Sequence, residues 1–365
     1  MSCCGNLVPA NETNILSLQC ILTSECQNSC KHCYVDKDDT QRMTFSLCKN
    51  LVDNFKQTLN KMNKDGRLIF TGGDPLMHPD FFKILEYTRS QLSDVKIHIL
   101  GNPEMLTDSI IHRLKEFADS YQLSLDGLEN THDSIRHIGS FRDTLEKMDL
   151  LIEHGIEVVI RTTMNRLNLS EIPDIYDLVF KRGAEVFSIH RFVPVGAGRF
   201  SKDLAEINPD KYRRLLLRVY DHHLQHQGIH CKLIVKEPLW KLLEMEEGIR
   251  ETDDLIFNDC VPGKYFCALP NGEFLICRML PISVGKASEG GIDQILKSSS
   301  VIEQMKRVDL LEECGDCELR ESCGGCRAMA YEVHGNYYSP DPYCWKIAQK
   351  LKSKEYSSSS EYYNK

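Results

Sequence analysis

Three cysteines in the stretch CQNSCKHCY, namely Cys26, Cys30 and Cys33, are the residues of this chain whose spacing most clearly indicates chemistry. Sixteen cysteines in 365 residues are too dilute for a secreted disulfide scaffold, so clustered thiols indicate metal ligands. A zinc site would need a fourth ligand, either a distant residue or His32. A 4Fe–4S cluster held by three thiolates would instead keep one iron open to a small molecule.

Short apolar runs alternate with longer amphipathic runs through the first half of the chain. The apolar runs predict six strands, at residues 15–22, 67–70, 95–100, 121–125, 157–163 and 185–190. The amphipathic runs predict helices between them, among them 45–62, 80–92, 108–117 and 171–183. Strands separated by single helices form the crossover units of a parallel sheet. Six units predict an α/β fold with a partial (β/α)6 TIM-like barrel, because a closed barrel needs eight.

Each of the first four predicted strands leads into an unusual motif. The cysteines follow the first strand, GGDP at 72–75 follows the second, GN at 101–102 follows the third, and SLDG at 124–127 ends the fourth. Loops at the carboxyl ends of parallel strands share one mouth of a barrel, so we expect the four motifs at one site. For GGDP, turn chemistry is the alternative, with Asp74 as a helix N-cap and Pro75 at the first helical position.

The pattern C-x3-C-x2-C followed by the aromatic Tyr34 resembles that of the radical S-adenosylmethionine (SAM) superfamily. The resemblance implies a 4Fe–4S cluster on Cys26, Cys30 and Cys33, with SAM on the open iron and cleaved to a 5′-deoxyadenosyl radical. GGDP is similar to the family's Gly-Gly-Glu-Pro, although Asp74 is one methylene shorter than glutamate. The cofactor-binding residues that the resemblance implies are Gly72, Gly73, Asp74, Pro75, Asn102, Ser124 and Asp126.

The segment from residue 260 to 344 is rich in cysteine and glycine, so we expect metal sites rather than an ordinary hydrophobic core to hold it together. Its pattern, C-x11-G-x4-C and then C-x2-C-x5-C-x2-C, resembles the SPASM extension of radical SAM proteins, which carries two auxiliary 4Fe–4S clusters. The resemblance implies an outer cluster on Cys314, Cys317, Cys323 and Cys344, and an inner cluster on Cys260, Cys277 and Cys326. Cys267 either completes the inner cluster or is a buried strand thiol. A pair of zinc knuckles is the alternative for the whole region.

The chain is therefore expected to have five parts: a flexible N-terminus at 1–14, a radical SAM core at 15–205, linking helices at 206–255, a small Cys-rich SPASM domain at 256–350, and a disordered tail at 351–365. Within the linking part, the pattern predicts a helix at 209–227, a short strand in KLIV and a helix at 237–247.

Composition excludes several classes of partner. A formal net charge of −9 argues against a broad nucleic-acid interface, which needs a basic face. No stretch approaches the roughly 18 apolar residues of a membrane span, so we expect no membrane partner. No secretory signal is visible at the start, which favours a reducing cytoplasm.

The resemblance also implies a substrate class, because radical SAM proteins with a SPASM extension mostly modify ribosomally made peptides or proteins. About fourteen residues precede the first strand, too few for a fused leader-binding domain, so a separate leader-binding partner is one expectation. An electron donor such as flavodoxin or ferredoxin is another. Sulfatase maturases place an aspartate where this chain has Arg278, which argues against that activity.

Two other functions stay open. A tetrapyrrole-tailoring enzyme of the haem or haem d1 type would bind propionates through arginines such as Arg191, Arg199 and Arg278. A non-catalytic iron–sulfur or zinc protein would not cleave SAM.

The remaining candidates have simpler interpretations. Cys20 and Cys48 lack ligand spacing and are expected to be core thiols. His222 and His226 stand four residues apart on a predicted helix, where a solvated face is favoured over a metal pair because no acidic residue of a known motif is near. Lys236, in the segment KEPLW, could contact substrate.

Overall fold

A single mixed sheet organises the protein. The computed structural model describes residues 14–36, 41–205, 208–226, 231–257 and 263–351. Within them the sheet has eleven strands in the order β11-β10-β9-β1-β2-β3-β4-β5-β6-β7-β8. Every neighbouring pair from β9 through β1 to β8 is parallel. Strand β10 is antiparallel to both of its neighbours, β9 and β11.

The six predicted strands are all present, with ends that differ from the prediction by no more than two residues. They are β1 (Ile15–Thr23), β2 (Asp65–Gly72), β3 (Lys96–Leu100), β4 (Ser120–Ser124), β5 (Glu157–Met164) and β6 (Val186–Arg191). The elements between them are α1 (Phe45–Met62), η1 (Pro75–Met77), α2 (Phe81–Gln91), α3 (Asp108–Leu114), α4 (Glu129–Ile135), α5 (Ser140–Glu153) and α6 (Ile172–Lys181). The expected α/β fold with a partial parallel barrel is confirmed.

Helix α1 shows how the sequence fixes these elements. The Thr44 side chain accepts a hydrogen bond from the Leu47 N–H, which satisfies one of the free donors at the helix start. Asn63 ends the helix in the left-handed conformation at φ 49°. Leu51 and Phe55, one turn apart, are fully buried and pack the helix onto the sheet.

The expectation of single helices between strands is wrong at one place. Two helices, α4 and α5, separate β4 from β5. Gly139 lies between them at φ 90°, a left-handed conformation that glycine adopts without strain. The chain therefore turns sharply before α5 packs against the sheet.

The part predicted as linking helices also extends the sheet. After η2 (Gly196–Phe200) and α7 (Lys202–Ala205) at the end of the predicted core, it contains α8 (Pro209–Leu224), β7 (Lys232–Lys236) and α9 (Trp240–Glu247), and β8 (Leu255–Phe257) begins at its last residue. Strand β7 pairs with β6 and β8 pairs with β7, both in parallel. The predicted boundary near residue 205 thus falls inside a continuous sheet, because the short apolar runs in this part supply two more strands.

The Cys-rich segment is likewise more regular than expected. It contains β9 (Tyr265–Ala268), β10 (Glu273–Cys277), β11 (Leu280–Lys286), α10 (Ile292–Ser298), α11 (Ser300–Met305), η3 (Val308–Leu310) and α12 (Arg327–His334). Strand β9 pairs directly with β1. Phe266 and Phe274 are buried in the same hydrophobic cluster as the barrel core. The expectation that this segment lacks an ordinary core is therefore wrong for its first half.

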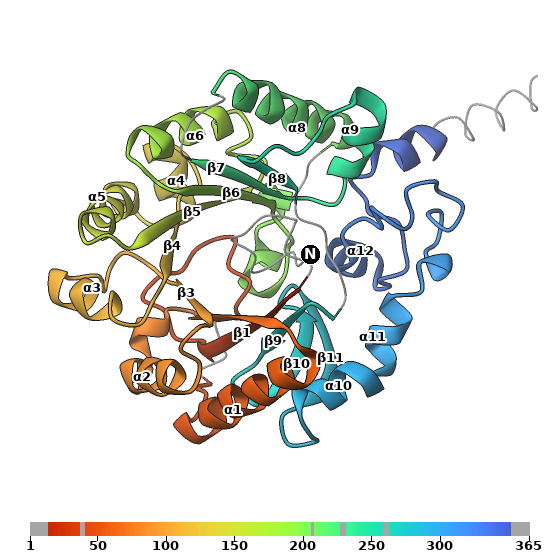
Figure 1. Cartoon of the computed structure of the whole chain (residues 1–365). Coiled ribbons are helices and arrows are strands. Elements are labelled where there is room, and N and C mark those ends of the chain that lie inside the picture. The colour runs from red at the N-terminus through yellow and green to blue at the C-terminus, as the bar shows by residue number, and fades with distance from the viewer. Residues whose placement is uncertain (1–13, 37–40, 206–207, 227–230, 258–262, 352–365) are drawn as a thin grey trace, which may run out of the picture.

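The strands curve around a common centre with α1 to α6 and α8 outside them (Figure 1). The C-terminal helices α10 to α12, drawn in blue, occupy the side between β11 and α9 (Figure 1). None of the helices in the described ranges is long and apolar enough to cross a membrane. The predicted N-terminal part at 1–14 and the tail at 351–365 lie almost entirely outside the described residues.

Candidate functional site

The predicted motifs meet in one cavity at the carboxyl ends of the parallel strands. The cavity has a volume of about 120 Å3 and is lined by the three cysteines that follow β1. Residues from the ends of the next strands complete its wall: Gly72, Gly73, Asn102, Ser124, Thr163 and His190. The structure thus brings together sequence motifs that lie up to about 100 residues apart.

Two glycines allow the cysteine loop to lie against the end of β2. A Cβ atom on Gly72 would lie 2.1 Å from the Thr23 carbonyl oxygen, and one on Gly73 would lie 2.2 Å from the Glu25 carbonyl oxygen. The Gly73 N–H donates to that Thr23 oxygen at 2.7 Å. Side chains at these positions would displace the backbone that leads into the cysteines, so both positions require glycine.

The aromatic residue after the third cysteine is also fixed. The Tyr34 hydroxyl donates to the Gly72 carbonyl oxygen at 3.1 Å. The Arg278 guanidinium lies over the Tyr34 ring, 4.4 Å from its centroid. Arg278 thereby connects the cysteine loop to the Cys-rich segment.

N–H groups point at two of the three sulfur atoms. The Asn102 side-chain amide donates to Cys26 Sγ at 3.2 Å, and the Asn28 backbone N–H donates to the same sulfur at 3.4 Å. The Arg136 guanidinium lies 3.7 Å from Cys30 Sγ. Donors of this kind stabilise thiolates and orient them toward a metal.

The thiols themselves are poorly suited to ionise without a cation. Burial raises the pKa of the Cys26 thiol to about 12, against the opposing hydrogen bond from Asn28. Burial likewise raises the pKa of Cys30, although the Arg136 charge opposes it. Three converging thiols, two of them of raised pKa and with donors aimed at their sulfurs, fit a metal cluster whose positive charge would hold them as thiolates.

Asp74 and Pro75 lie behind the cavity wall. The Asp74 carboxylate accepts hydrogen bonds from Gln27 Nε2 at 2.8 Å and from the Leu76 N–H at 3.0 Å, where it caps the short helix η1. Burial raises the pKa of this carboxyl to about 6. Turn chemistry, the alternative for GGDP, therefore describes the contacts of Asp74 in the structure, whereas Gly72 and Gly73 line the cavity.

Asp126, an expected cofactor-binding residue, is fully buried, and its carboxylate contacts other protein groups. Its carboxylate accepts from Arg136 Nε at 2.8 Å and from the Thr163 N–H at 2.8 Å, and lies 3.3 Å from His32 Nε2. Burial opposes ionisation, but the charges of His32 and Arg136 outweigh it and hold the Asp126 pKa well below its usual value. Asp126 thus positions Arg136 and His32, which both line the cavity.

Several cavity residues were not predicted from the sequence. Arg136, Gln122, Arg161, Thr163 and His190 line it, and none belongs to a short motif. Alternation along the strands offered a signal for some of them, since Gln122 and Ser124 share a strand face, as do Arg161 and Thr163. Arg136 lies in the turn after α4 and carried no sequence signal.

The four cysteines assigned to the outer cluster line a second cavity. It has a volume of about 500 Å3, and Cys314, Cys317, Cys323 and Cys344 all contribute to its wall. Burial raises the pKa of Cys344 to about 11, with a smaller contribution from the Cys314 thiol. Four thiols around one cavity fit the ligand set of a 4Fe–4S cluster.

The cysteines assigned to the inner cluster are less completely described. Cys277 and Cys326 line a third cavity of about 340 Å3, together with Cys323. Cys260 lies outside the described residues. Cys267 is fully buried on β9 and pairs with Leu275 of β10, so it lies on the same sheet face as Cys277 two residues further on. This geometry fits Cys267 as a ligand of the inner cluster and equally fits Cys267 as a buried strand thiol.

The third cavity adjoins the first. His190, Arg191, Val193, Arg278 and Met279 line both of them. A group bound at the three-cysteine loop would therefore face the Cys-rich segment across these shared residues.

Two of the three arginines expected to bind propionates, Arg191 and Arg199, are paired with protein carboxylates. Arg191 donates to both Asp341 oxygens at 2.7 Å and to Glu237, and all three side chains are buried. Arg199 Nε lies 3.6 Å from the Glu332 carboxylate at the surface. Arg191 lines both cavities, but its guanidinium is held by the Glu237 and Asp341 carboxylates. Lys236, a suggested substrate contact, is buried and lines the third cavity.

The core thiols are as expected. Cys20 and Cys48 are buried in the main hydrophobic cluster. Burial raises the pKa of the Cys48 thiol to about 12. These cysteines are therefore neutral, inert packing residues.

Comparison with known proteins covers the whole site. Residues 20–179, from β1 into α6, match the family model described as the Radical SAM superfamily. The chain is 27% identical over 338 residues to the AdoMet-dependent heme synthase of Methanosarcina barkeri, covering 88% of this chain and 94% of that protein. It is 29% identical over 209 residues to the antilisterial bacteriocin subtilosin biosynthesis protein AlbA of Bacillus subtilis, covering 56% of this chain and 44% of that protein.

A solved structure shows the same fold. Streptococcus suis SuiB bound to S-adenosylmethionine aligns with a TM-score of 0.71 at 16% identity, covering 90% of this chain and 77% of that chain.

Proposed function

This chain contains a radical SAM domain, and on that premise we propose that it is an enzyme that modifies a ribosomally made peptide or protein by cross-linking or oxidation. Cys26, Cys30 and Cys33 would hold a 4Fe–4S cluster, and SAM would bind in the adjoining cavity. When bound, this cluster and SAM supply a 5′-deoxyadenosyl radical that removes a hydrogen atom from the substrate. The protein's own residues bind, orient and shield these groups.

Different residues around the cavity would bind, orient and shield the cluster and SAM. Asn102 and Arg136 donate hydrogen bonds to cysteine sulfurs, and Asp126 keeps Arg136 in place from behind. Gly72 and Gly73 let a ligand approach the backbone, and Ser124 offers a hydroxyl at the cavity wall. Asp74 stabilises the turn that carries the two glycines.

Two auxiliary 4Fe–4S clusters complete the proposal. The outer one would use the four cysteines around the 500 Å3 cavity, and the inner one would use Cys277 and Cys326 with Cys260 and Cys267. The substrate would enter the 340 Å3 cavity between the inner cluster and the three-cysteine loop. An electron donor such as flavodoxin or ferredoxin would be required, and a leader-binding partner could present the substrate.

The observation that favours a peptide over a tetrapyrrole is the pairing of Arg191. Its guanidinium is buried between Glu237 and Asp341, and Arg199 faces Glu332. A propionate would have to displace these carboxylates and leave buried charges unpaired, at a cost of about 3–5 kcal/mol. The same cavity is lined by apolar side chains, including Ile276, Met279, Leu280 and Val193, which suit peptide side chains.

A tetrapyrrole substrate is the second candidate. Its support is the length of the similarity to the heme synthase, which covers 94% of that protein, whereas the similarity to AlbA covers 44%. Arg278 lines both cavities and could meet one carboxylate of such a substrate.

The test compares the two substrate classes directly. Reduced enzyme with its clusters loaded is incubated anaerobically with SAM and either iron coproporphyrin III or a short peptide encoded beside its gene, and 5′-deoxyadenosine is quantified. We expect the peptide to change in mass and to accelerate 5′-deoxyadenosine formation, and the porphyrin to remain intact. Loss of propionate carboxyl groups from the porphyrin would overturn the peptide assignment in favour of the second candidate.

A further inference from the structure

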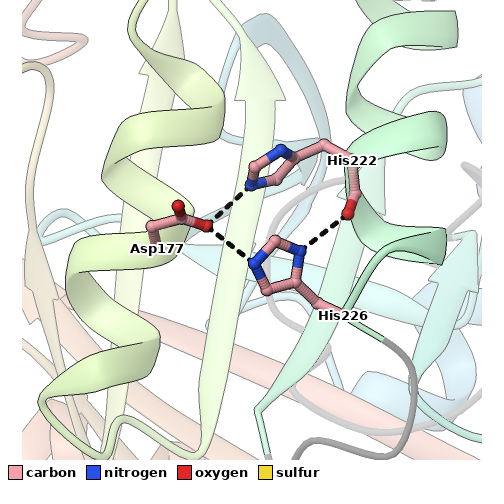
Figure 2. A group of neighbouring side chains, drawn as sticks. All are labelled: Asp177, His222 and His226. Atoms are coloured by element: carbon pink, nitrogen blue, oxygen red, sulfur yellow. Dashed lines mark hydrogen bonds and ion pairs between the residues drawn. The ribbon is translucent and has the colours of Figure 1, made fainter.

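Two histidines and an aspartate converge on the outer surface of the barrel. His222, in the last turn of α8, and His226, just beyond its end, face Asp177 of α6 (Figure 2). His222 Nε2 lies 2.7 Å and His226 Nε2 lies 3.1 Å from the same oxygen, Asp177 Oδ1. All three ligand atoms lie within 4.8 Å of one another.

The hydrogen bond on the other side of His226 fixes its tautomer. His226 Nδ1 lies 2.9 Å from the His222 carbonyl oxygen, which can only accept, so Nδ1 must carry a proton and donate (Figure 2). In the neutral imidazole, Nε2 then holds a lone pair. That lone pair points at a carboxylate oxygen 3.1 Å away, so two acceptors face each other. A positive charge between them is needed to make the arrangement favourable.

No basic side chain supplies that charge. Within the described part of the chain, the ion-pair partners of Asp177 are these two histidines, and no lysine or arginine pairs with it. The three side chains are 19–29% exposed, so solvent ions can reach them. An N–H of one imidazole bonded to a backbone carbonyl, with its other nitrogen directed at a carboxylate, is the arrangement that orients histidine as a metal ligand.

We propose that Asp177, His222 and His226 form a binding site for a divalent transition-metal ion, with zinc as the best match. Zinc takes imidazole nitrogen and carboxylate oxygen at about 2.0–2.2 Å in a tetrahedral arrangement, which places its ligand atoms about 3.3 Å apart. The two spacings from the histidine nitrogens to Asp177 Oδ1, 2.7 and 3.1 Å, are close to that value, and the two histidine nitrogens lie within 4.8 Å of each other. Water would fill the fourth position.

The expected effect of the ion is to join two helices that cover the sheet. Asp177 comes from α6, and the histidines come from the end of α8. Next to them, the Tyr176 hydroxyl hydrogen-bonds His223 Nδ1 at 3.0 Å, so the helices are already in contact beneath the site. The sequence favoured a solvated face for His222 and His226 because no acidic residue of a known motif is near. Asp177 lies 45 residues before His222 in the chain, and only the fold brings it close.

The test uses the full chain with its iron–sulfur clusters loaded, because empty cysteines would also take up zinc. Wild type, His226→Gln and Asp177→Asn are dialysed anaerobically against buffered zinc at pH 7.5, and bound zinc and iron are counted. His154→Gln is the matched control, since His154 Nε2 lies 2.8 Å from Asp108 Oδ1 but this pair has no second histidine within ligand distance among the described residues. Thermal unfolding with and without zinc gives a second readout.

We expect wild type and His154→Gln to retain one more zinc per chain than the two site variants, whose affinity falls at least about tenfold. Zinc should raise the unfolding temperature of wild type and not that of the variants. Equal zinc retention in all four proteins, or binding only at millimolar zinc, would overturn the site. SAM cleavage is expected to be unaffected, so this test is independent of the proposed enzymatic function.

Discussion

The three-cysteine loop and the Cys-rich segment build cysteine sites in opposite ways. In the loop, all three thiols come from one short stretch after β1 and line one cavity. In the Cys-rich segment, the thiols come from the strand β10, from the turns before α12 and from the chain after it, and they line two cavities. One set is local in the sequence, and the other exists only once the chain has folded.

The difference lies in what supports each set. The loop depends on groups from the barrel: Gly72 and Gly73 make room for it, and Asn102 and Arg136 donate to its sulfurs. The Cys-rich segment is joined to the barrel by the pairing of β9 with β1 and by the buried contact of Arg191 with Asp341. The arrangement of the three loop cysteines can therefore be lost by changing one loop. The arrangement of the cysteines in the Cys-rich segment can be lost by separating that segment from the barrel.

The largest expected effect is on SAM cleavage, which should depend on the cysteines of the three-cysteine loop and not on those of the Cys-rich segment. Cys30→Ala should lower 5′-deoxyadenosine formation by more than about 100-fold, because it removes a proposed cluster ligand that lines the cavity proposed for SAM. Cys317→Ala should leave SAM cleavage without substrate within a few-fold of wild type. Both are measured by mass spectrometry after reduction.

Iron content is the control for this pair. Wild type should hold about twelve irons per chain, and each variant should lose about four. Loss of SAM cleavage in Cys317→Ala with its remaining eight irons in place would show that the two sets are not independent.

The next effect concerns the junction of the two regions. Asp341→Asn leaves the buried Arg191 guanidinium with one full carboxylate partner, so the free energy of unfolding should fall by about 3 kcal/mol. Glu318→Gln, which breaks the exposed pair with Lys346, should cost less than about 1 kcal/mol. Anaerobic denaturant titration measures both. Similar midpoints for the two variants would contradict a stabilising role for the junction.

A smaller effect, on the free energy of unfolding, depends on pH and concerns His132, which contacts Asp126 behind the proposed SAM cavity. His132 Nδ1 accepts from the Asp126 N–H at 2.9 Å, and burial lowers the pKa of His132 to about 3. The unfolded chain has a histidine pKa of about 6.5, so it binds the proton first as the pH falls. Stability from neutral His132 is therefore present above about pH 6.5 and is lost progressively below it, by about 2 kcal/mol at pH 5.

The measurement compares unfolding of wild type and His132→Asn at pH 7 and pH 5. Asparagine can accept the same Asp126 N–H bond but does not titrate. Wild type should lose about 2 kcal/mol more than the variant over this range. Equal losses would mean that His132 is not the group responsible.

The smallest effect concerns the N–H group that faces Cys26. Asn102→Leu removes one hydrogen bond to a cluster thiolate, worth about 1 kcal/mol. Because the bond favours the more negative, reduced cluster, its loss should lower the reduction potential by about 40 mV for one electron. An anaerobic redox titration followed by EPR measures this. An unchanged potential would show that the contact does not persist when the cluster is bound.

The barrel and the three-cysteine loop could be predicted from the sequence because both are encoded locally. Apolar runs gave the six strands, and the spacing of Cys26, Cys30 and Cys33 indicated one ligand set. Strands β9 to β11 were missed because their short apolar runs lie among cysteines and glycines, and because the pairing of β9 with β1 joins residues about 250 positions apart.

The parts of the site that were missed depend on long-range contacts. Asp126 carries the SLDG signal, yet its carboxylate is directed at Arg136 and Thr163, which only the folded chain brings close. Asp74 follows β2 as predicted, but its carboxylate accepts hydrogen bonds from Gln27 and from the Leu76 N–H. The motifs thus predicted which segments meet at the cavity, and did not determine which of their side chains point into it.

The central claim is that the three-cysteine loop holds a cluster with one position open to SAM. The direct measurement is the EPR spectrum of the reduced protein before and after SAM is added, for wild type and for Cys26→Ala, which keeps every C-terminal cysteine. SAM should alter the wild-type spectrum and have no effect on that of the variant. A wild-type spectrum that SAM does not change, or a change that persists in Cys26→Ala, would contradict the claim.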